Sequence, residues 1–154
     1  MTAETPDAAF RALGDWEAAG PLRAAVVILH DPLGRVLMQL RDDRPGVAYP
    51  GTWAPFGGGV EGAETLPEAA AREVVEELGI ALRPGALSPF ACTPSDLPGR
   101  RRIYAFSAPF PGNARDIRLG EGAGFAFFTH AQLGALPLPP HIALVMQAWT
   151  AAGG

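Results

Sequence analysis

The feature that most restricts the fold is a helix with clearly marked ends in the middle of the chain. Thr65 followed by Glu68 has the pattern of a capping box, in which the hydroxyl and the carboxylate each satisfy a free N–H at a helix start. Pro67 suits the first turn, where its missing N–H does no harm. Gly79 suits a left-handed helix end. These signals predict one helix over residues 66–78.

Three acids of this helix fall on one side of it. At about 100° per residue, Glu73, Glu76 and Glu77 share an arc of about 100°. A separate apolar face is formed by Ala70, Ala71, Val74, Val75 and Leu78. Neighbouring like charges destabilise a helix by roughly a few tenths of a kcal/mol, and a divalent cation would remove that repulsion. Mg²⁺ and Mn²⁺ prefer oxygen ligands. Taken alone, the acids favour a solvated acidic face, with a cation site as the alternative.

Two neighbouring features support a ligand site at this helix. The glycine run 57–59 lies just upstream, and it lets the backbone approach a ligand closely and offer its carbonyl groups. Arg72, beside Glu73, can orient a carboxylate or contact a phosphate. Together with the acids, these residues predict a site that handles a metal ion and an anionic ligand.

The segments on either side of the helix read as strands. Residues 31–34 supply turn residues between two apolar, β-branched segments, so a hairpin is expected there. Residues 41–59 have loop composition, with room for one short strand. The predicted strands cover residues 23–30, 35–40, 86–92, 101–108 and 123–128, and the later helices cover residues 130–136 and 141–151. Strands before and after one central helix favour an α+β fold with a mixed sheet.

Length and composition bound the class of protein. The 154 residues suffice for one domain with a core, and we divide them into an appended segment, residues 1–20, and a single domain, residues 21–154. Residues 7–19 have the composition of a short helix, which Gly14 interrupts. No apolar run approaches the roughly 18 residues of a membrane span, and the acidic N-terminus does not resemble a signal peptide. Cys92 is the one cysteine, which excludes an internal disulfide and a thiolate zinc site and fits the cytoplasm.

The charged residues limit the chemistry further. A net charge of −4 argues against binding to a nucleic-acid backbone. All 12 basic residues are arginine, so Schiff-base chemistry and a P-loop lysine are excluded. If the protein handles phosphates, it must bind them through arginine, backbone N–H groups or metal ions.

The central segment resembles the signature of a known family. The pattern GX5EX7REUXEEXGU, with U aliphatic, is met at every defined position from Gly58 to Ile80. This pattern is the Nudix box, so the chain resembles Nudix hydrolases, and its strand order extends the resemblance over roughly residues 21–152. Phe56 is one departure, because many members have proline before the glycines.

The resemblance implies a fold, a reaction and a set of metal ligands. The implied fold is an α/β/α sandwich, and the implied reaction is metal-dependent hydrolysis of a nucleoside diphosphate linked to another moiety, with Mg²⁺ or Mn²⁺. Glu76 and Glu77 are then the main metal ligands, with Glu73 and the Gly58 carbonyl nearby. Glu73 is either a ligand or the base. Water would attack phosphorus while the metal neutralises the phosphates and a carboxylate takes the proton.

Residues around the box complete the expected site. By the resemblance, Arg72 orients the carboxylates, and Glu64 organises the glycine loop and contacts the substrate or a further ion. Glu121, in a glycine-flanked loop, is a candidate metal ligand or base, and Arg41 is a candidate for a distal phosphate. The basic run 100–102 could meet phosphates, but we interpret it as a solvated loop. Four aromatic residues could stack on a base, although core packing is favoured for each of them. They are Tyr49, Trp53, Phe56 and Phe125.

Several alternatives stay open at this point. A Nudix domain could bind or sense a nucleotide without turnover, although three facing acids argue for catalysis. An isomerase of isopentenyl diphosphate needs a reactive cysteine, and Cys92 lies in an apolar strand. The histidines, His141 among them, lack ligand spacing and are interpreted as structural, and Asp96 has no identifiable partner. The expected partner is a small nucleotide, with no nucleic acid or membrane, and a homodimer is plausible.

Overall fold

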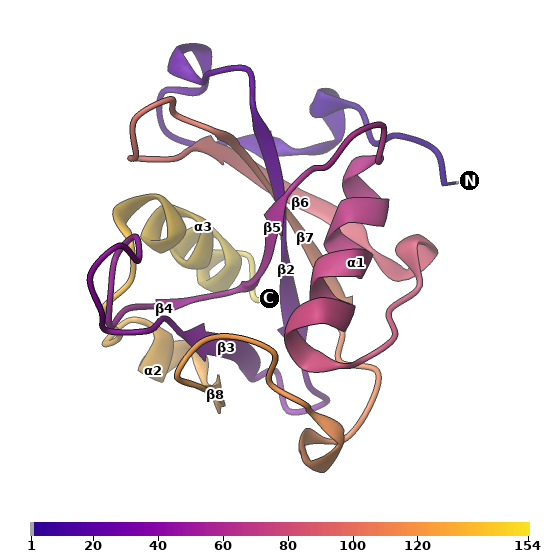
Figure 1. Ribbon diagram of the computed structural model, residues 1–154, viewed down its shortest axis with the longest axis vertical. Coiled ribbons are helices and arrows are strands. Elements are labelled where there is room, and N and C mark those ends of the chain that lie inside the picture. Colours follow the sequence, from indigo (N-terminus) through magenta and orange to yellow (C-terminus); the bar gives the residue numbers. More distant parts are fainter. Residues whose placement is uncertain (1) are drawn as a thin grey trace.

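The computed structural model describes residues 2–154 as strands and helices in mixed order (Figure 1). The strands are β1 (Arg11–Ala12), β2 (Arg23–His30), β3 (Val36–Leu40), β4 (Trp53–Ala54), β5 (Phe56–Gly59), β6 (Ser88–Pro94), β7 (Arg102–Pro109) and β8 (Gly124–Phe128). The helices are α1 (Leu66–Leu78), α2 (His130–Leu133) and α3 (Pro140–Ala151), and the 3₁₀ turns are η1 (Asp7–Ala9), η2 (Trp16–Ala18), η3 (Pro84–Ala86) and η4 (Ala114–Asp116).

The sheet is organised around β2. It runs in the order β1-β6-β7-β2-β3-β4, while β5 also pairs with β2 and β8 with β3. β2 pairs in parallel with β7 along its whole length. Its other edge is shared, because Ala24–Val27 pair with β5 and Leu29–His30 pair with β3, both antiparallel. The sheet therefore divides beside β2, and strand ends from both branches line the cavity described below.

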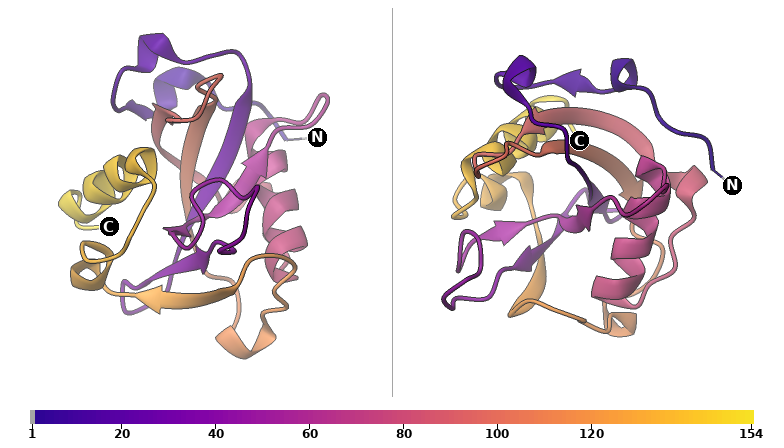
Figure 2. Two further views of the ribbon diagram at one scale, coloured as in Figure 1. Left: turned by 60° about the vertical axis from the view of Figure 1, so that its left-hand side comes forward. Right: turned by 45° about the horizontal axis from the view of Figure 1, so that its top comes forward.

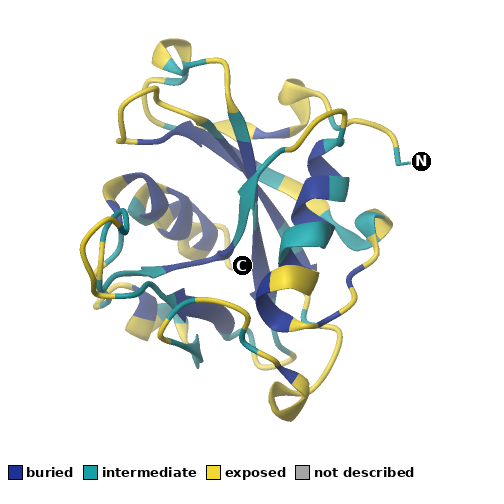
Figure 3. Cartoon of the chain, in the orientation of Figure 1, coloured by how far each residue is buried: buried dark blue, intermediate teal, exposed yellow. Residues whose placement is uncertain are grey.

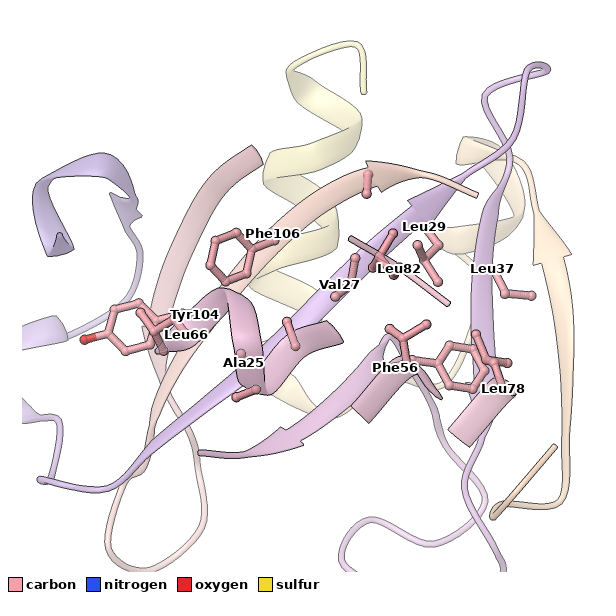
Figure 4. Packing of buried hydrophobic residues seen from close by; sticks show 14 of the residues in the cluster. Ala25, Val27, Leu29, Leu37, Phe56, Leu66, Leu78, Leu82, Tyr104 and Phe106 are labelled. Atoms are coloured by element: carbon pink, nitrogen blue, oxygen red, sulfur yellow. The ribbon is translucent and has the colours of Figure 1, made fainter. Parts of the chain in front are cut away.

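Helices cover both faces of this sheet (Figure 2). Alternate residues of β2, such as Val27 and Leu29, pack in one apolar cluster with Leu66 and Leu78 of α1 (Figure 4). Ile28 packs in a second cluster, with α2 and α3. This period of two is that of a strand buried on both faces. The structure thus confirms the α+β class, the mixed sheet and the sandwich of helices around it.

The central helix is confirmed to the residue. The Thr65 side chain accepts from the Glu68 N–H and the Glu68 carboxylate accepts from the Thr65 N–H, which completes the capping box. Gly79 ends the helix with φ of 68°. One side of α1 is buried against the sheet, and the part near its C-terminal end is exposed (Figure 3). The helix ends that place the acids are therefore set by local sequence signals.

Other sequence predictions require correction. The helix suggested for residues 7–19 is wrong, because these residues form η1, β1 and η2; the break expected at Gly14 is present, with Gly14 in a left-handed conformation between β1 and η2. The helix expected over 130–136 ends at Leu133. The strand expected over 86–92 covers Ser88–Pro94, and residues 41–59 hold two short strands instead of one.

The N-terminal segment lies against the domain. Arg11 and Ala12 pair in parallel with β6, and the Phe10 ring is 6% exposed, edge-on to the rings of Tyr104 and Phe106. A carboxylate oxygen of Glu4 accepts from the first free N–H of α1, at 2.9 Å. The segment therefore contributes to the core and to the start of the central helix. No helix within residues 2–154 is long and apolar enough to cross a membrane.

Candidate active site

Three carboxylates meet beside β5. One oxygen each of Glu73, Glu77 and Glu121 lies within 4.8 Å of the other two. Glu73 and Glu77 stand one turn apart on α1, and Glu121 comes from the loop before β8. Gln39 Nε2 donates to the Glu121 carbonyl at 2.9 Å, which ties that loop to β3. The structure thus joins an acid 44 to 48 positions away along the chain to the helix pair, at a spacing that one cation could bridge.

The glycines of β5 allow the helix to approach the strand this closely. The Gly57 N–H donates to Glu77 Oε1 at 2.8 Å. A Cβ atom on Gly58 would lie 2.5 Å from a Glu73 carboxylate oxygen, and one on Gly57 would lie 2.2 Å from the Ala25 carbonyl. A side chain at Gly57 would clash with the β2 backbone, whereas a side chain at Gly58 would require the Glu73 carboxylate to move. Gly57 therefore allows β5 to lie close to β2, and Gly58 allows the Glu73 carboxylate to lie against β5.

Burial makes the two acids on α1 hard to ionise. Glu77 is 3% exposed, and burial raises its pKa to about 8, with added repulsion from Glu121 and Glu73. Burial also raises the pKa of Glu73, although the Arg72 guanidinium acts in the opposite direction. A buried carboxylate whose neighbours are two further acids is stabilised when a cation lies beside it. The donor set consists of oxygens alone, so it fits Mg²⁺ or Mn²⁺.

Arg72 links the box residues in one network. Its guanidinium donates to both carboxylate oxygens of Glu64, at 2.6 and 3.0 Å, and to the Gly59 carbonyl at 3.0 Å. It also donates to Glu73 at 3.0 Å and to Glu76 at 3.2 Å. The hydrogen bond from Arg72 lowers the pKa of Glu64. The network holds the glycine loop and one carboxylate of the acid cluster in fixed positions.

Glu76 lies apart from the cluster. Its side chain is 57% exposed and pairs with Arg72. On a helix, Glu76 and Glu77 point about 100° apart, so both cannot face β5 at once. Among residues 2–154, the acids brought together are Glu73, Glu77 and Glu121. The expected role of Glu76 as a main ligand stays a prediction.

A cavity of about 360 Å³ opens beside the acids. Gly58, Glu77 and Glu121 line it, and so do Arg41 and Arg101. The Arg41 Nε donates to the Ala48 carbonyl at 2.6 Å, which fixes the side chain at the cavity. Within the described part of the chain, neither arginine forms a salt bridge. From the sequence we preferred a solvated loop for Arg101 over a phosphate contact, because only the sheet register brings Arg101 near Gly59.

The aromatic candidates separate clearly in the structure. Phe56 is fully buried in the apolar cluster between β2 and α1, and Phe125 packs against that cluster. The Trp53 ring lies edge-on to the Phe128 ring. Tyr49 lines the cavity. His141 also lines it and pairs with Asp96. His141 and Asp96 lie 45 positions apart, so no local sequence pattern indicates their contact.

Cys92 does not offer a reactive thiol. The residue is 1% exposed in β6, and burial raises its pKa to about 11. The thiolate is the nucleophilic form, so a thiol with this pKa is inert at neutral pH. This environment argues against chemistry that needs a catalytic cysteine.

Comparisons with known proteins agree with this geometry. Residues 20–149 match the family model described as NUDIX domain. Over 56 residues the chain is 48% identical to the nucleoside triphosphatase NudI of Enterobacter sp. (strain 638), an alignment that covers 36% of this chain and 38% of that protein. The chain thus spans less than two fifths of this curated relative in the alignment.

Solved structures extend the similarity to nearly the whole chain. The dihydroneopterin triphosphate pyrophosphohydrolase of E. coli has a TM-score of 0.68 at 22% identity, covering 87% of this chain and 98% of that one. The NUDIX domain of Shewanella oneidensis NrtR, complexed with ADP ribose, has a TM-score of 0.70 at 14% identity, covering 90% and 92%. At these identities the likeness establishes the fold.

Proposed function

The chain belongs to the NUDIX domain family, and we propose that it is a metal-dependent pyrophosphohydrolase. The proposed substrate is a nucleoside diphosphate linked to another moiety, and the proposed reaction is attack of water at phosphorus. The observation that carries this proposal is the meeting of Glu73, Glu77 and Glu121 within 4.8 Å around a buried acid. Such a cluster destabilises a fold unless a cation completes it, so its presence supports a metal-dependent function.

The residues of the site divide into distinct tasks under this proposal. Glu73, Glu77 and Glu121 would hold the cation, which when bound neutralises phosphate charge and lowers the pKa of water. Glu73 or Glu121 accepts the proton of the attacking water. Arg72 keeps Glu73 oriented through the hydrogen bond at 3.0 Å. The products would be a nucleoside monophosphate and a second phosphorylated product or pyrophosphate.

Two arginines are available for the phosphates. Arg41 and Arg101 line the same cavity as Glu77 and pair with no carboxylate among the described residues. Guanidinium groups bind phosphate oxygens through paired hydrogen bonds. Their position supports contacts with the phosphates of the substrate. The chain contains no lysine that could make these contacts.

Nucleoside triphosphates are the first substrates to test. The relative in Enterobacter is named a nucleoside triphosphatase, which supports this class, and sugar nucleotides come next. A domain that only binds a nucleotide is the second candidate, since the NUDIX domain of NrtR is described in complex with ADP ribose. The cytoplasmic location and the homodimer stay predictions.

The test is a substrate screen with matched variants. Nucleoside triphosphates, sugar nucleotides and dinucleoside polyphosphates are incubated with Mg²⁺ or Mn²⁺, and monophosphate release is measured for wild type, Glu77→Gln and Glu17→Gln. Glu17 is an exposed acid in η2, so its variant should match wild type. Glu77→Gln should lose about 100-fold in rate, at or above the loss seen when metal-supporting residues are removed. A wild-type protein that binds nucleotides but releases no monophosphate would favour the sensor.

A further inference from the structure

One part of the cavity is formed by segments outside the Nudix box. Tyr49 comes from the loop between β3 and β4, Ser95 and Leu97 come from the loop after β6, and His141 comes from the start of α3. These residues line the same cavity as Glu77 and Glu121. α3 and α1 lie on opposite sides of β2 and β5 (Figure 1). The cavity therefore has an acidic wall on the α1 side and a second wall on the α3 side.

His141 is held in one orientation on this second wall. One carboxylate oxygen of Asp96 accepts from the His141 backbone N–H at 2.8 Å and lies 2.9 Å from the imidazole Nδ1. Burial raises the pKa of Asp96, but hydrogen bonds from His141 outweigh burial and lower it overall. An ionised carboxylate only accepts, so Nδ1 carries the proton. Nε2 is then the ring nitrogen that remains for a ligand.

Tyr49 is held beside this imidazole in an unusual backbone conformation. Its φ of 50° lies in the left-handed region, which residues other than glycine rarely adopt. The Thr52 hydroxyl donates to the Tyr49 carbonyl at 2.7 Å, and Arg41 donates to the neighbouring Ala48 carbonyl. The Tyr49 and His141 rings lie 5.9 Å apart between centroids. Such strain persists where the surroundings enforce it, and it gathers at ligand sites.

From this arrangement we infer that Tyr49 and His141 recognise the heteroaromatic base of the substrate. The inference rests on the proposed function and deepens it. The Tyr49 ring offers an aromatic face to the base, and the His141 Nε2 forms a hydrogen bond with a polar group on the base edge. The volume of about 360 Å³ is near the lower end for ligand pockets, so it suits one nucleoside rather than two. The inferred substrate is a mononucleoside polyphosphate, with its phosphates toward the acids.

The test measures binding without catalysis. The probes are the four common ribonucleoside 5′-monophosphates, with ribose 5-phosphate as the control that lacks a base, titrated calorimetrically in the presence of a chelator. The variants are Tyr49→Leu, His141→Asn and His141→Gln. Leucine meets the same backbone strain as tyrosine but has no ring. Asparagine can keep the contact with Asp96 while removing Nε2, whereas glutamine keeps a polar atom near the Nε2 position.

We expect at least one monophosphate to bind more tightly than ribose 5-phosphate. Tyr49→Leu and His141→Asn should each weaken the binding of that monophosphate about tenfold. For Tyr49→Leu this loss is typical of one lost stacking contact. The binding of ribose 5-phosphate should stay unchanged. His141→Gln should recover part of the loss. Thermal melting identifies a variant that does not fold, and the Tyr49→Leu result then stands alone because Tyr49 is only partly buried.

Other results would overturn the inference. Equal binding of ribose 5-phosphate and all monophosphates by wild type, or equal losses for both ligand types in the variants, would mean that the pair does not contact the base. The proposed function fails differently, because the substrate screen would then detect no hydrolysis while the base-dependent binding persists.

Discussion

Replacing Glu77 with glutamine should make the metal-free protein more stable at pH 8. Burial raises the pKa of Glu77 from 4.5 to about 8. The folded state therefore keeps the proton in a pH range where the unfolded state has released it. Stability from this group is fully present below about pH 4.5 and falls as the pH rises toward 8. Glutamine has no proton to lose and can still accept from the Gly57 N–H.

The size of the effect follows from proton linkage. A pKa change from 4.5 to about 8 corresponds to about 5 kcal/mol in full, of which about 3.5 kcal/mol develops between pH 5 and pH 8. The variant should therefore gain about 3.5 kcal/mol over wild type across this interval. Urea unfolding with a chelator, followed by tryptophan fluorescence at both pH values, measures the difference.

A control and a metal titration complete this experiment. Glu76→Gln changes an acid on the same helix whose side chain is 57% exposed, so its effect on the free energy of unfolding should stay within about 1 kcal/mol. Adding Mg²⁺ or Mn²⁺ should stabilise wild type more than Glu77→Gln, because the cation binds the folded state through this carboxylate. If Glu77→Gln is instead less stable than wild type at pH 8 without metal, the reasoning on buried charge is refuted.

Three further substitutions test the packing around the site. Gly58→Ala should reduce hydrolysis at least about tenfold and destabilise the fold by about 1–3 kcal/mol, because its Cβ would lie 2.5 Å from a Glu73 oxygen. Steady-state kinetics measures the first effect and urea unfolding the second. Unchanged kinetics would contradict the close packing of Glu73 against Gly58. Arg72→Lys should lower kcat by about tenfold or more, since lysine cannot reproduce the forked contact with Glu64; a kcat equal to wild type would show that charge alone suffices. Phe10→Ala should cost about 3–5 kcal/mol in urea unfolding, whereas a loss below about 1 kcal/mol would mean that the N-terminal segment is dispensable for the core.

The parts of the molecule that the sequence predicts are those set by neighbours in the chain. Helix α1 was predicted with its bounds because Thr65, Glu68 and Gly79 fix its ends through contacts within four residues. β2 was predicted for a similar reason, since its apolar run marks a strand buried on both faces. Strand β1 could not be predicted from neighbouring residues, because it forms only through pairing with Ala91 and Cys92, far along the chain.

The candidate site divides in the same way. Glu73 and Glu77 follow from helical spacing, and Glu121 follows from its glycine-flanked loop together with the family resemblance. Spacing alone could not decide which neighbour of Glu77 joins the cluster, since that choice depends on where β5 lies. The contact of His141 with Asp96 depends on how α3 docks against the loop after β6, and local sequence does not encode that docking.

Three departures from ordinary folding rules meet at one cavity. Glu77 is a buried acid beside other acids, and Tyr49 has a left-handed backbone conformation. In β5, glycine occupies positions 57 and 58, where a side chain would clash with its neighbours. Each departure costs stability, and a leucine at position 77 would remove the largest cost. Strain of this kind is expected where function opposes stability. Because all three lie on the walls of the same cavity, a common ligand explains them together, whereas unrelated defects would be scattered over the fold.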